Sequence, residues 1–375
     1  MFHLVTGLIA LYVFWRMVGP QRWPRAVKAV LGVLILAAAE HHLITRNFFG
    51  SMASPEIPGD VLMFLGWAFG ALIVSALALL VLDAVTLLFA RAATVSRVVR
   101  APGLRAGVGL AAMLLSALGV WQAVRVPDVR DVEIELAQLP AELDGLQLVQ
   151  LTDLHASRLL QRPWMEAVVA KANALQPDLM VITGDLVDGT VAARTQDVEP
   201  LRDLTARLGV YAIPGNHEYY AEYQHWLDHF ESLGLPMLLN EHLTIEDAGA
   251  SLVVAGITDP AASRFGQPLP DIKAALAGVP QEAAVILLSH RPLAASGNAL
   301  AGADLQLSGH THGGQVLGMH WVTQAFNEGY VSGEYAVGDM RLYVSNGAGL
   351  WNGFPLRLGK PSEITRITLR APSGR

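Results

Sequence analysis

The chain has 375 residues, a formal net charge of −7 and no cysteine, and its mean hydropathy of +0.38 is high for a soluble protein. This length allows one large domain with an appendage, or two domains. Residues 1–125 hold ten of the 26 basic and four of the 33 acidic side chains, so they carry +6 and the remainder −13. The lack of cysteine excludes disulfides and thiolate metal ligands. The acidic second part is not expected to bind nucleic acid, because neutralising phosphates requires clustered Lys and Arg.

The first 125 residues contain four apolar segments, at about 3–19, 26–44, 61–90 and 104–124. A helix that crosses a membrane needs about 20 apolar residues, and each segment reaches or approaches that length. We therefore expect residues 1–125 to form an all-helical transmembrane region of about four helices. Buried helices of a globular domain are the less favoured alternative.

The basic residues between these segments predict the orientation of the chain. They gather in the first and third connections, as Arg16, Arg22, Arg25 and Lys28, and as Arg91, Arg97, Arg100 and Arg105. By the positive-inside rule these two connections are cytoplasmic, which places residues 126–375 on the outer side. Asp83 lies within the third segment, where an ionisable residue is expensive. It either pairs with a neighbouring helix or belongs to an ion or lipid pathway.

Residues 126–375 alternate between strand-like and helix-like patterns. Strand patterns occur at 132–136, 146–151, 179–182, 210–213, 252–257, 285–288, 305–307 and 342–345. Amphipathic helical patterns fall between several of them, near 162–175, 197–208, 218–233 and 271–277. This order predicts an α/β domain with helices covering its sheets. The alternating tail at 363–369 is typical of a closing edge strand.

Short blocks of possible metal ligands begin where five of the apolar runs end. They are Asp153-Leu154-His155, Gly184-Asp185-Leu186-Val187-Asp188, Gly215-Asn216-His217-Glu218, Ser289-His290 and Gly309-His310-Thr311-His312-Gly313-Gly314-Gln315. In α/β sheets, sites form outside the carboxyl ends of strands, so residues that are distant in sequence converge there. Asp153 and His155 are two residues apart, as are His310 and His312, which on an extended chain puts both side chains on one side.

Carboxylate, imidazole and amide ligands together suit Mn²⁺, Fe or Zn²⁺. Two ions about 3.5–4 Å apart need a bridging carboxylate, for which Asp185 is the candidate, and such a pair clamps phosphoryl oxygens and activates water. His217 is the candidate general acid for the leaving oxygen. Taken singly, Asp153 with His155 could be a surface pair, Asn216 a turn residue and His290 a structural histidine. The Gly-His-Thr-His-Gly-Gly run is specific, and the five blocks together indicate a two-metal hydrolase.

These blocks, in this order, resemble the calcineurin-like metallophosphoesterase superfamily over roughly residues 145–370. The stretch 343–349, Pro355-Leu356-Arg357 and Glu363-Ile364 are similar to its bacterial membrane-linked branch, and multi-span N-terminal regions occur in relatives called transmembrane proteins with a metallophosphoesterase domain. The resemblance implies that 126–375 form a four-layer αββα sandwich with a dinuclear centre between its sheets. It also implies a protein of the bacterial cytoplasmic membrane.

The resemblance further implies the ligands of two divalent metal ions. One ion would be held by Asp153, His155, Asp185 and His312, and the second by Asp185, Asn216, His290 and His310. His217 matches the family's histidine that contacts the leaving group or the phosphate. No ligand position of the family's pattern is missing, which argues against a degenerate family member that binds without catalysing a reaction.

The predicted function is therefore that of a membrane-anchored, metal-dependent phosphoesterase. Only about seven residues separate the last span from the first strand, so we expect a membrane-associated substrate such as a phospholipid head group, a lipid-linked saccharide diphosphate or an envelope phosphodiester. Residues 218–220 are expected to line the pocket mouth. Residues 350–354 are expected to line it as well, to contact a lipid or the membrane surface, or to form a packed loop. The alternative is a non-catalytic membrane module that senses metal or phosphate. The sequence leaves open the metals, the choice between monoester and diester, and the oligomeric state.

Overall fold

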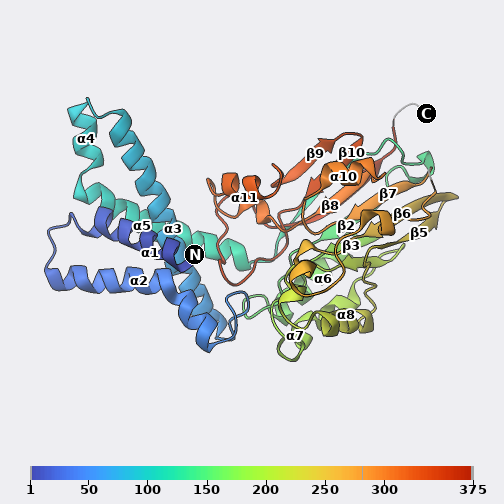
Figure 1. Ribbon diagram of the computed structural model, residues 1–375, viewed down its shortest axis with the longest axis horizontal. Coiled ribbons are helices and arrows are strands. Elements are labelled where there is room, and N and C mark those ends of the chain that lie inside the picture. The colour runs from blue at the N-terminus through green and yellow to red at the C-terminus, as the bar shows by residue number, and fades with distance from the viewer. Residues whose placement is uncertain (1, 281, 373–375) are drawn as a thin grey trace. The chain divides into compact units, whose positions relative to one another are not determined.

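The computed structural model describes residues 2–280 and 282–372 (Figure 1). It divides into two compact units. The first comprises Met1–Ala123 together with Asn352–Leu358, and the second comprises Val124–Trp351 together with Gly359–Arg375. The two units are described separately below.

The first unit is helical. Its elements are α1 (Phe2–Val13), the π-helical turn η1 (Phe14–Val18), α2 (Arg25–Phe48), α3 (Gly59–Leu88), α4 (Ala93–Val99) and α5 (Pro102–Val124). Pro24 and Pro58 directly precede α2 and α3, where the missing proline N–H breaks no helical hydrogen bond. Among the described residues, α2, α3 and α5 are long and apolar enough to cross a membrane. The first predicted span, 3–19, corresponds to a shorter apolar helix over Phe2–Val18.

Asp83 on α3 is paired with side chains of other helices. Its Oδ2 accepts hydrogen bonds from Tyr12 Oη at 2.9 Å and from Arg16 Nε at 2.7 Å, and its Oδ1 accepts a second bond from Arg16. Arg105 Nη2 of α5 lies 3.7 Å from Oδ1. Charged residues within membrane helices are expected to face the bundle and pair in this way. The pairing favours a structural role over an ion or lipid pathway.

The segment Asn352–Leu358, although late in the chain, packs with the helices of the first unit. His42 Nε2 on α2 lies 2.6 Å from the Gly353 carbonyl oxygen, and Arg357 N donates to the Gly119 carbonyl oxygen of α5 at 3.0 Å. Of the alternatives for residues 350–354, the part from Asn352 onward is therefore a packed loop.

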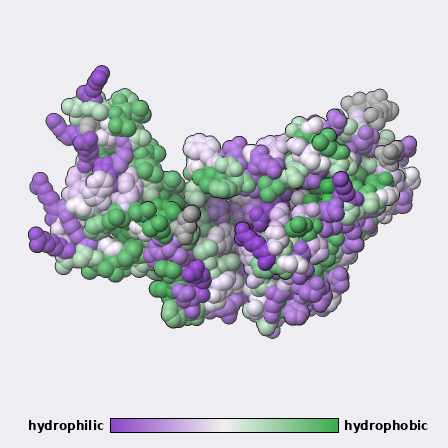
Figure 2. All heavy atoms as spheres, in the orientation of Figure 1, coloured by the Kyte–Doolittle hydropathy of each residue, from purple (hydrophilic) through white to green (hydrophobic). Residues whose placement is uncertain are grey.

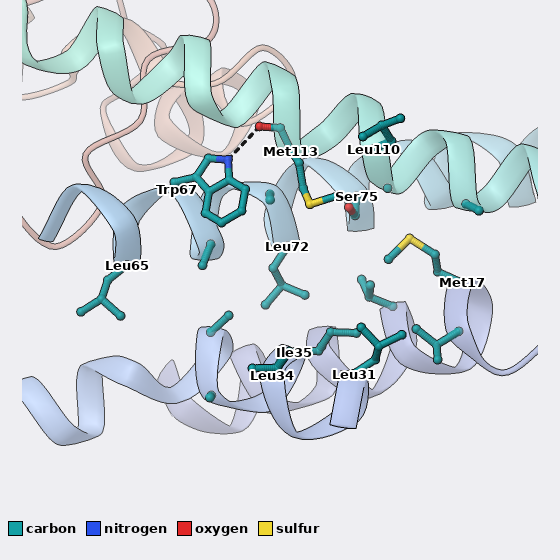
Figure 3. A pocket seen from close by; sticks show the side chains of 18 of the residues that line it. Met17, Leu31, Leu34, Ile35, Leu65, Trp67, Leu72, Ser75, Leu110 and Met113 are labelled. Atoms are coloured by element: carbon teal, nitrogen blue, oxygen red, sulfur yellow. Dashed lines mark hydrogen bonds between the residues drawn. The ribbon is translucent and has the colours of Figure 1, made fainter. Parts of the chain in front are cut away.

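An apolar cavity of about 470 Å³ lies among the helices of the first unit (Figure 3). Its lining includes Met17, Leu31, Ile35, Leu72 and Leu110. On one wall, Trp67 Nε1 donates to the Met113 carbonyl oxygen at 2.9 Å. This bond links α3 to α5.

The second unit contains two sheets. The first has the strand order β1-β11-β2-β3-β4, with β1 Asp128–Glu135, β11 Glu363–Arg370, β2 Gln147–Leu151, β3 Leu179–Thr183 and β4 Val210–Ile213. The second has the order β5-β6-β7-β8-β10-β9, with β5 Glu241–Asp247, β6 Ala250–Gly256, β7 Ala284–Leu288, β8 Leu305–Ser308, β10 Met340–Val344 and β9 Gly333–Val337. β2, β3 and β4 are parallel, as are β6, β7, β8 and β10. The carboxyl ends of these parallel strands therefore gather at one edge of each sheet.

The two sheets pack face to face and carry helices on their outer faces. These helices are α6 (Arg162–Asn173), α7 (Val191–Val198), α8 (Tyr223–Ser232), α9 (Ile272–Ala275) and α10 (Ala295–Leu300). A further helix, α11 (His320–Phe326), has no buried residue. Short 3₁₀ turns occur at Ala141–Leu143, Glu199–Asp203, Glu218–Tyr220, Pro260–Arg264 and His312–Gly314.

Separate apolar clusters define the layers of the second unit. One joins α6 and α8 to the first sheet and includes Met165, Trp226 and Met180. The next lies between the sheets and includes Leu148 and Ile286. A third joins α9 and α10 to the second sheet. The predicted four-layer αββα sandwich is thereby confirmed.

The tail strand was expected at a sheet edge, and this prediction is wrong. β11 lies between β1 and β2 and is hydrogen-bonded on both sides. Its alternation has another cause, because Ile367 lies in the core between the sheets whereas Arg366 pairs with Asp131 on the other face. The pattern reports one apolar and one polar face and does not reveal the neighbours of a strand. The sequence also gave no prediction of β5, β9, α10 or α11.

Candidate metal centre

The five ligand blocks follow the carboxyl ends of five strands. Asp153 follows β2, Asp185 follows β3, Asn216 follows β4, His290 follows β7 and His310 follows β8. These strands run parallel within each sheet, so their loops meet at one edge of the sandwich. The structure thus brings together residues that lie up to about 160 positions apart in sequence.

The backbone of this site is strained. Five of the seven predicted ligands have a left-handed conformation, with φ of 55° at Asp153, 46° at His155, 54° at Asp185, 68° at His310 and 49° at His312. Such a conformation costs energy for a residue with a Cβ atom and persists only where the surroundings fix it. Here Asp153 N donates to Gly184 O and His155 N donates to Asp185 O, both at 3.0 Å. Strain of this kind is typical of functional sites.

Two carboxylates form the centre of the cluster. Asp185 Oδ2 lies 3.1 Å from His290 Nε2, 3.7 Å from His155 Nε2 and 4.0 Å from His217 Nε2. Asp153 Oδ1 lies 3.6 Å from His312 Nε2 and 3.9 Å from His155 Nε2.

These side chains form three overlapping groups, in each of which the possible ligand atoms lie within 4.8 Å of one another. The groups are Asp153, His155 and His312; His155, Asp185 and His217; and Asp185, His290 and His310. Asp185 belongs to two of the groups, as a bridging carboxylate would.

The spacing and burial of these atoms fit a divalent metal ion. Bonds from such an ion to nitrogen or oxygen are about 2.0–2.2 Å long, so two ligands of one ion lie roughly 3–4 Å apart. Among the described residues, buried His155 Nε2 and buried Asn216 Oδ1 have no hydrogen-bond partner. Buried polar atoms are rarely left unsatisfied because the loss of hydration is costly. A metal ion would satisfy both atoms.

The second nitrogens of two candidate ligand histidines are held by neighbouring groups. His155 Nδ1 lies 3.1 Å from Asp188 Oδ1, and His290 Nδ1 lies 2.8 Å from the Thr183 carbonyl oxygen. A metal-ligating histidine commonly uses its other N–H in this way, which fixes the ring and its tautomer. In both residues Nε2 is left to face the cluster.

The carboxylates and histidines of the site shift one another's pKa values. Burial opposes the ionised form of Asp185, but the imidazoles of His290 and His217 hold its pKa well below the ordinary value. Burial and the nearby His290 lower the pKa of His310 well below its ordinary value, so its imidazole is neutral and able to bind a metal. Burial also opposes the charged form of His217, yet Asp185 and Asp188 raise its pKa to about 9.

Asp188 is a site residue that the sequence analysis did not select. Its Oδ1 lies 3.1 Å from His155 Nδ1 and 2.5 Å from His217 Nδ1. Burial favours the neutral acid, but these two histidines lower the pKa of Asp188 to about 2. One carboxylate therefore orients both a metal-ligand candidate and the acid candidate. Its position at the end of the Gly-Asp-Leu-Val-Asp block was the only signal.

Glu218 does not line the pocket mouth as expected. It is fully buried, and its Oε2 accepts the N–H groups of Asp185 and Gly215, while Oε1 accepts those of Leu186 and Val187, at 2.6–3.2 Å. It thus holds the loops after β3 and β4 together.

The two tyrosines after Glu218, which were also expected at the pocket mouth, differ in their exposure. Tyr219 is buried, whereas Tyr220 is 48% exposed and its ring centroid lies 5.0 Å from that of His217. The Trp351 ring centroid lies 6.3 Å from that of His217. Tyr220 and Trp351 are therefore the aromatic residues that border the site.

The loop after β10 also contacts the site. Gly349 N donates to the Asp153 carbonyl oxygen at 2.8 Å. This loop is fixed by Glu363, which accepts hydrogen bonds from Tyr343 Oη at 2.8 Å and from Asn346 Nδ2 at 2.9 Å. The stretch 343–349 and Glu363 thereby support the backbone around Asp153.

Residues 146–314 match the family model described as calcineurin-like phosphoesterase. The chain is 36% identical over 266 residues to a transmembrane protein with metallophosphoesterase domain of Danio rerio, covering 68% of this chain and 60% of the relative. It is 31% identical over 277 residues to an uncharacterized metallophosphoesterase of Bacillus subtilis, covering 70% of this chain and 94% of the relative. The chain spans about three fifths of the length of its transmembrane relatives.

Among solved structures, the calcineurin-like phosphoesterase YfkN of Bacillus subtilis is similar at 17% identity and a TM-score of 0.32. The match covers 45% of this chain and 72% of that chain.

Proposed function

Because the chain belongs to the calcineurin-like metallophosphoesterase family, we propose that it hydrolyses phosphoester bonds at a dinuclear metal centre tethered to a membrane. The family uses divalent metals. The observation that carries the proposal is the set of three overlapping ligand groups at the ends of five strands. In the proposed assignment Asp153, His155, Asp185 and His312 hold one ion, and Asp185, Asn216, His290 and His310 hold the other. The ions would be Mn²⁺, Fe or Zn²⁺.

The residues around the ligands support catalysis. Bound ions would supply positive charge for the phosphoryl oxygens and lower the pKa of a water molecule. His217 Nδ1 is held by Asp188, so its Nε2 is the atom that can give a proton to the leaving oxygen. The His217 side chain is 11% exposed and is bordered by Tyr220 and Trp351, which limit the access of water.

Two features of the connectivity support a membrane-associated substrate. α5 ends at Val124 and β1 begins at Asp128, so three residues, which span at most about 11 Å, connect the helix to the sheet. Trp351, beside His217, is followed directly by the segment Asn352–Leu358 that packs with the helices. We propose a lipid head group, a lipid-linked saccharide diphosphate or an envelope phosphodiester as the substrate.

The orientation remains as proposed from the basic connections, with the second unit on the outer face of a bacterial cytoplasmic membrane. A reporter that is active only outside the cytoplasm, fused after Arg375, should be active. Activity of a cytoplasm-only reporter at the same position would reverse the orientation.

The hydrolytic proposal is tested with the full chain in detergent, stripped of metal and then supplied with Mn²⁺. We expect metal-dependent hydrolysis of bis-p-nitrophenyl phosphate or p-nitrophenyl phosphate that is lost in Asp185→Asn. The matched control is Asp203→Asn, at an exposed position away from the site, which should retain the activity. Equal turnover by both variants would contradict the proposal.

His217→Ala separates catalysis from metal sensing. An enzyme in which His217 is the acid should retain its metal content and lose turnover, because His217 is not among the proposed ligands. Unchanged turnover would remove His217 from the mechanism.

A further inference from the structure

An exposed apolar patch lies on and beside α11 in the second unit. Its members are Leu317, Trp321, Val322 and Phe326, with exposed fractions of 75%, 69%, 57% and 78%. We refer to these four residues as the α11 patch. Hydrophobic residues are visible at the position of α11 in the space-filling view (Figure 2). Single exposed apolar residues are ordinary, but a contiguous group marks a surface that contacts a partner or a membrane.

The other face of α11 borders a cavity. Trp321, Val322 and Phe326 lie within an arc of roughly 140° on a helix of 3.6 residues per turn. His320 and Gln324 lie on the opposite side and line a cavity of about 480 Å³. α11 is therefore amphipathic. Its polar face is directed toward the cavity, and its apolar face is exposed on the surface of the second unit.

One lining residue of the cavity is adjacent in sequence to the candidate metal centre. That residue is Gly313, which directly follows His312, a proposed ligand. Val316, Val331 and Tyr335 supply apolar walls, and Lys360 supplies a cation. The volume lies within the range of about 300–1,000 Å³ that is usual for small-molecule sites. An amphiphile with an anionic group near Lys360 and the metal centre fits this lining.

We propose that the α11 patch inserts into the bilayer that holds the chain's own helices, and that lipid phosphoesters enter the adjacent cavity along α11. The inference rests on the proposed phosphoesterase function for the reaction, and it specifies the substrate class as a phosphoester that carries an acyl chain. Trp, Phe and Leu on one face of a short helix are the residues that bind such an interface. The same chain contains α2, α3 and α5, which are long and apolar enough to cross a membrane.

The absence of cysteine from the chain allows a direct test. Val322→Cys carries a spin label on the patch, and Leu300→Cys carries the control label, because Leu300 is 91% exposed and lies on α10 outside the patch. Both variants are prepared as the full chain in phosphatidylcholine vesicles. The label at position 322 should be accessible to oxygen and protected from a water-soluble nickel complex, whereas the label at 300 should show the opposite.

Two spectroscopic outcomes would overturn the inference. If the label at position 322 is as accessible to nickel as the label at 300, the patch is in water. If its spectrum is broadened by a second label, the patch contacts another copy of the chain. Neither outcome depends on turnover, so the test stands apart from the phosphoesterase proposal.

A kinetic test uses ethyl and hexadecyl 4-nitrophenyl phosphate, two diesters that release the same phenol and differ in their alkyl chain. In Trp321→Gln/Phe326→Gln, the ratio of hexadecyl to ethyl ester hydrolysis should fall about tenfold or more, because two apolar side chains no longer hold the interface. Leu300→Gln should leave the ratio unchanged. An unaltered ratio in the α11 variant would overturn the inference. Failure to hydrolyse either ester would instead count against the phosphoesterase proposal, while the spin-label test would still decide the position of the patch.

Discussion

Glu218→Gln should destabilise the second unit without changing the shape of the side chain. Each Glu218 oxygen accepts two backbone N–H groups. Glutamine retains one oxygen and turns an NH₂ group toward the other two N–H donors. Each buried N–H left without an acceptor costs about 1–3 kcal/mol, so the loss is about 2–6 kcal/mol. This is a large part of the roughly 5–15 kcal/mol that stabilises a domain.

Thermal unfolding of the full chain, followed by tryptophan fluorescence, measures the effect. A domain of this size changes its Tm by about 2–4 °C per kcal/mol, so we expect Tm to fall by at least about 4 °C. Glu231→Gln makes the same chemical change at an exposed position on α8 and should leave Tm unaltered. A fall of less than about 2 °C in Glu218→Gln would refute the assignment of the four hydrogen bonds.

Three further predictions concern the site and the sheet. Asp188→Asn should lower kcat about 10–100-fold with a retained fold, because a supporting carboxylate orients two histidines. Gly215→Ala should reduce the metal content and cost about 1–3 kcal/mol, because a Cβ there would overlap the Asp185 carboxylate, whereas Gly297→Ala meets no neighbouring atom and should be neutral. Asp304→Asn should raise stability at neutral pH, since burial raises the pKa of Asp304 above its ordinary 3.8, although the N–H of Val285 opposes this.

The sign of the Asp304 effect follows from proton uptake. The folded state holds this proton more tightly than the unfolded state, so the stabilisation is complete below pH 3.8 and is lost as the pH rises through the folded-state pKa. The difference in Tm between Asp304→Asn and the parent should therefore grow from pH 4 to pH 6. A constant difference would contradict this reasoning. The other two predictions fail if Asp188→Asn has full turnover, or if Gly215→Ala retains metal as Gly297→Ala does.

The positions of the candidate ligand residues at strand ends could be predicted because each follows an apolar run. A buried strand is a local pattern, and the position just after it is also local, so Asp153, Asp185 and His310 could be placed at strand ends from sequence alone. Parallel pairing then brings those ends together. The imidazoles and carboxylates at these positions are the reason for the metal-site hypothesis.

The supporting residues could not be predicted because their roles depend on contacts between loops. Glu218 ends a candidate ligand block and was expected at the pocket mouth, yet it is buried against the loop after β3. β11 has the alternation of an edge strand but lies inside its sheet. The segment Asn352–Leu358 has no pattern that indicates its packing against α2 and α5. Periodicity reports which side of an element is apolar, and it does not identify the partner.

The dinuclear centre is the central claim, and anomalous diffraction at the manganese edge from crystals of the full chain grown with Mn²⁺ tests it most directly. A dinuclear centre should give two peaks, about 3.5–4 Å apart. One should lie within bonding distance of Asp153, His155, Asp185 and His312, and the other within bonding distance of Asp185, Asn216, His290 and His310. A single peak, or two peaks without Asp185 between them, would contradict the account.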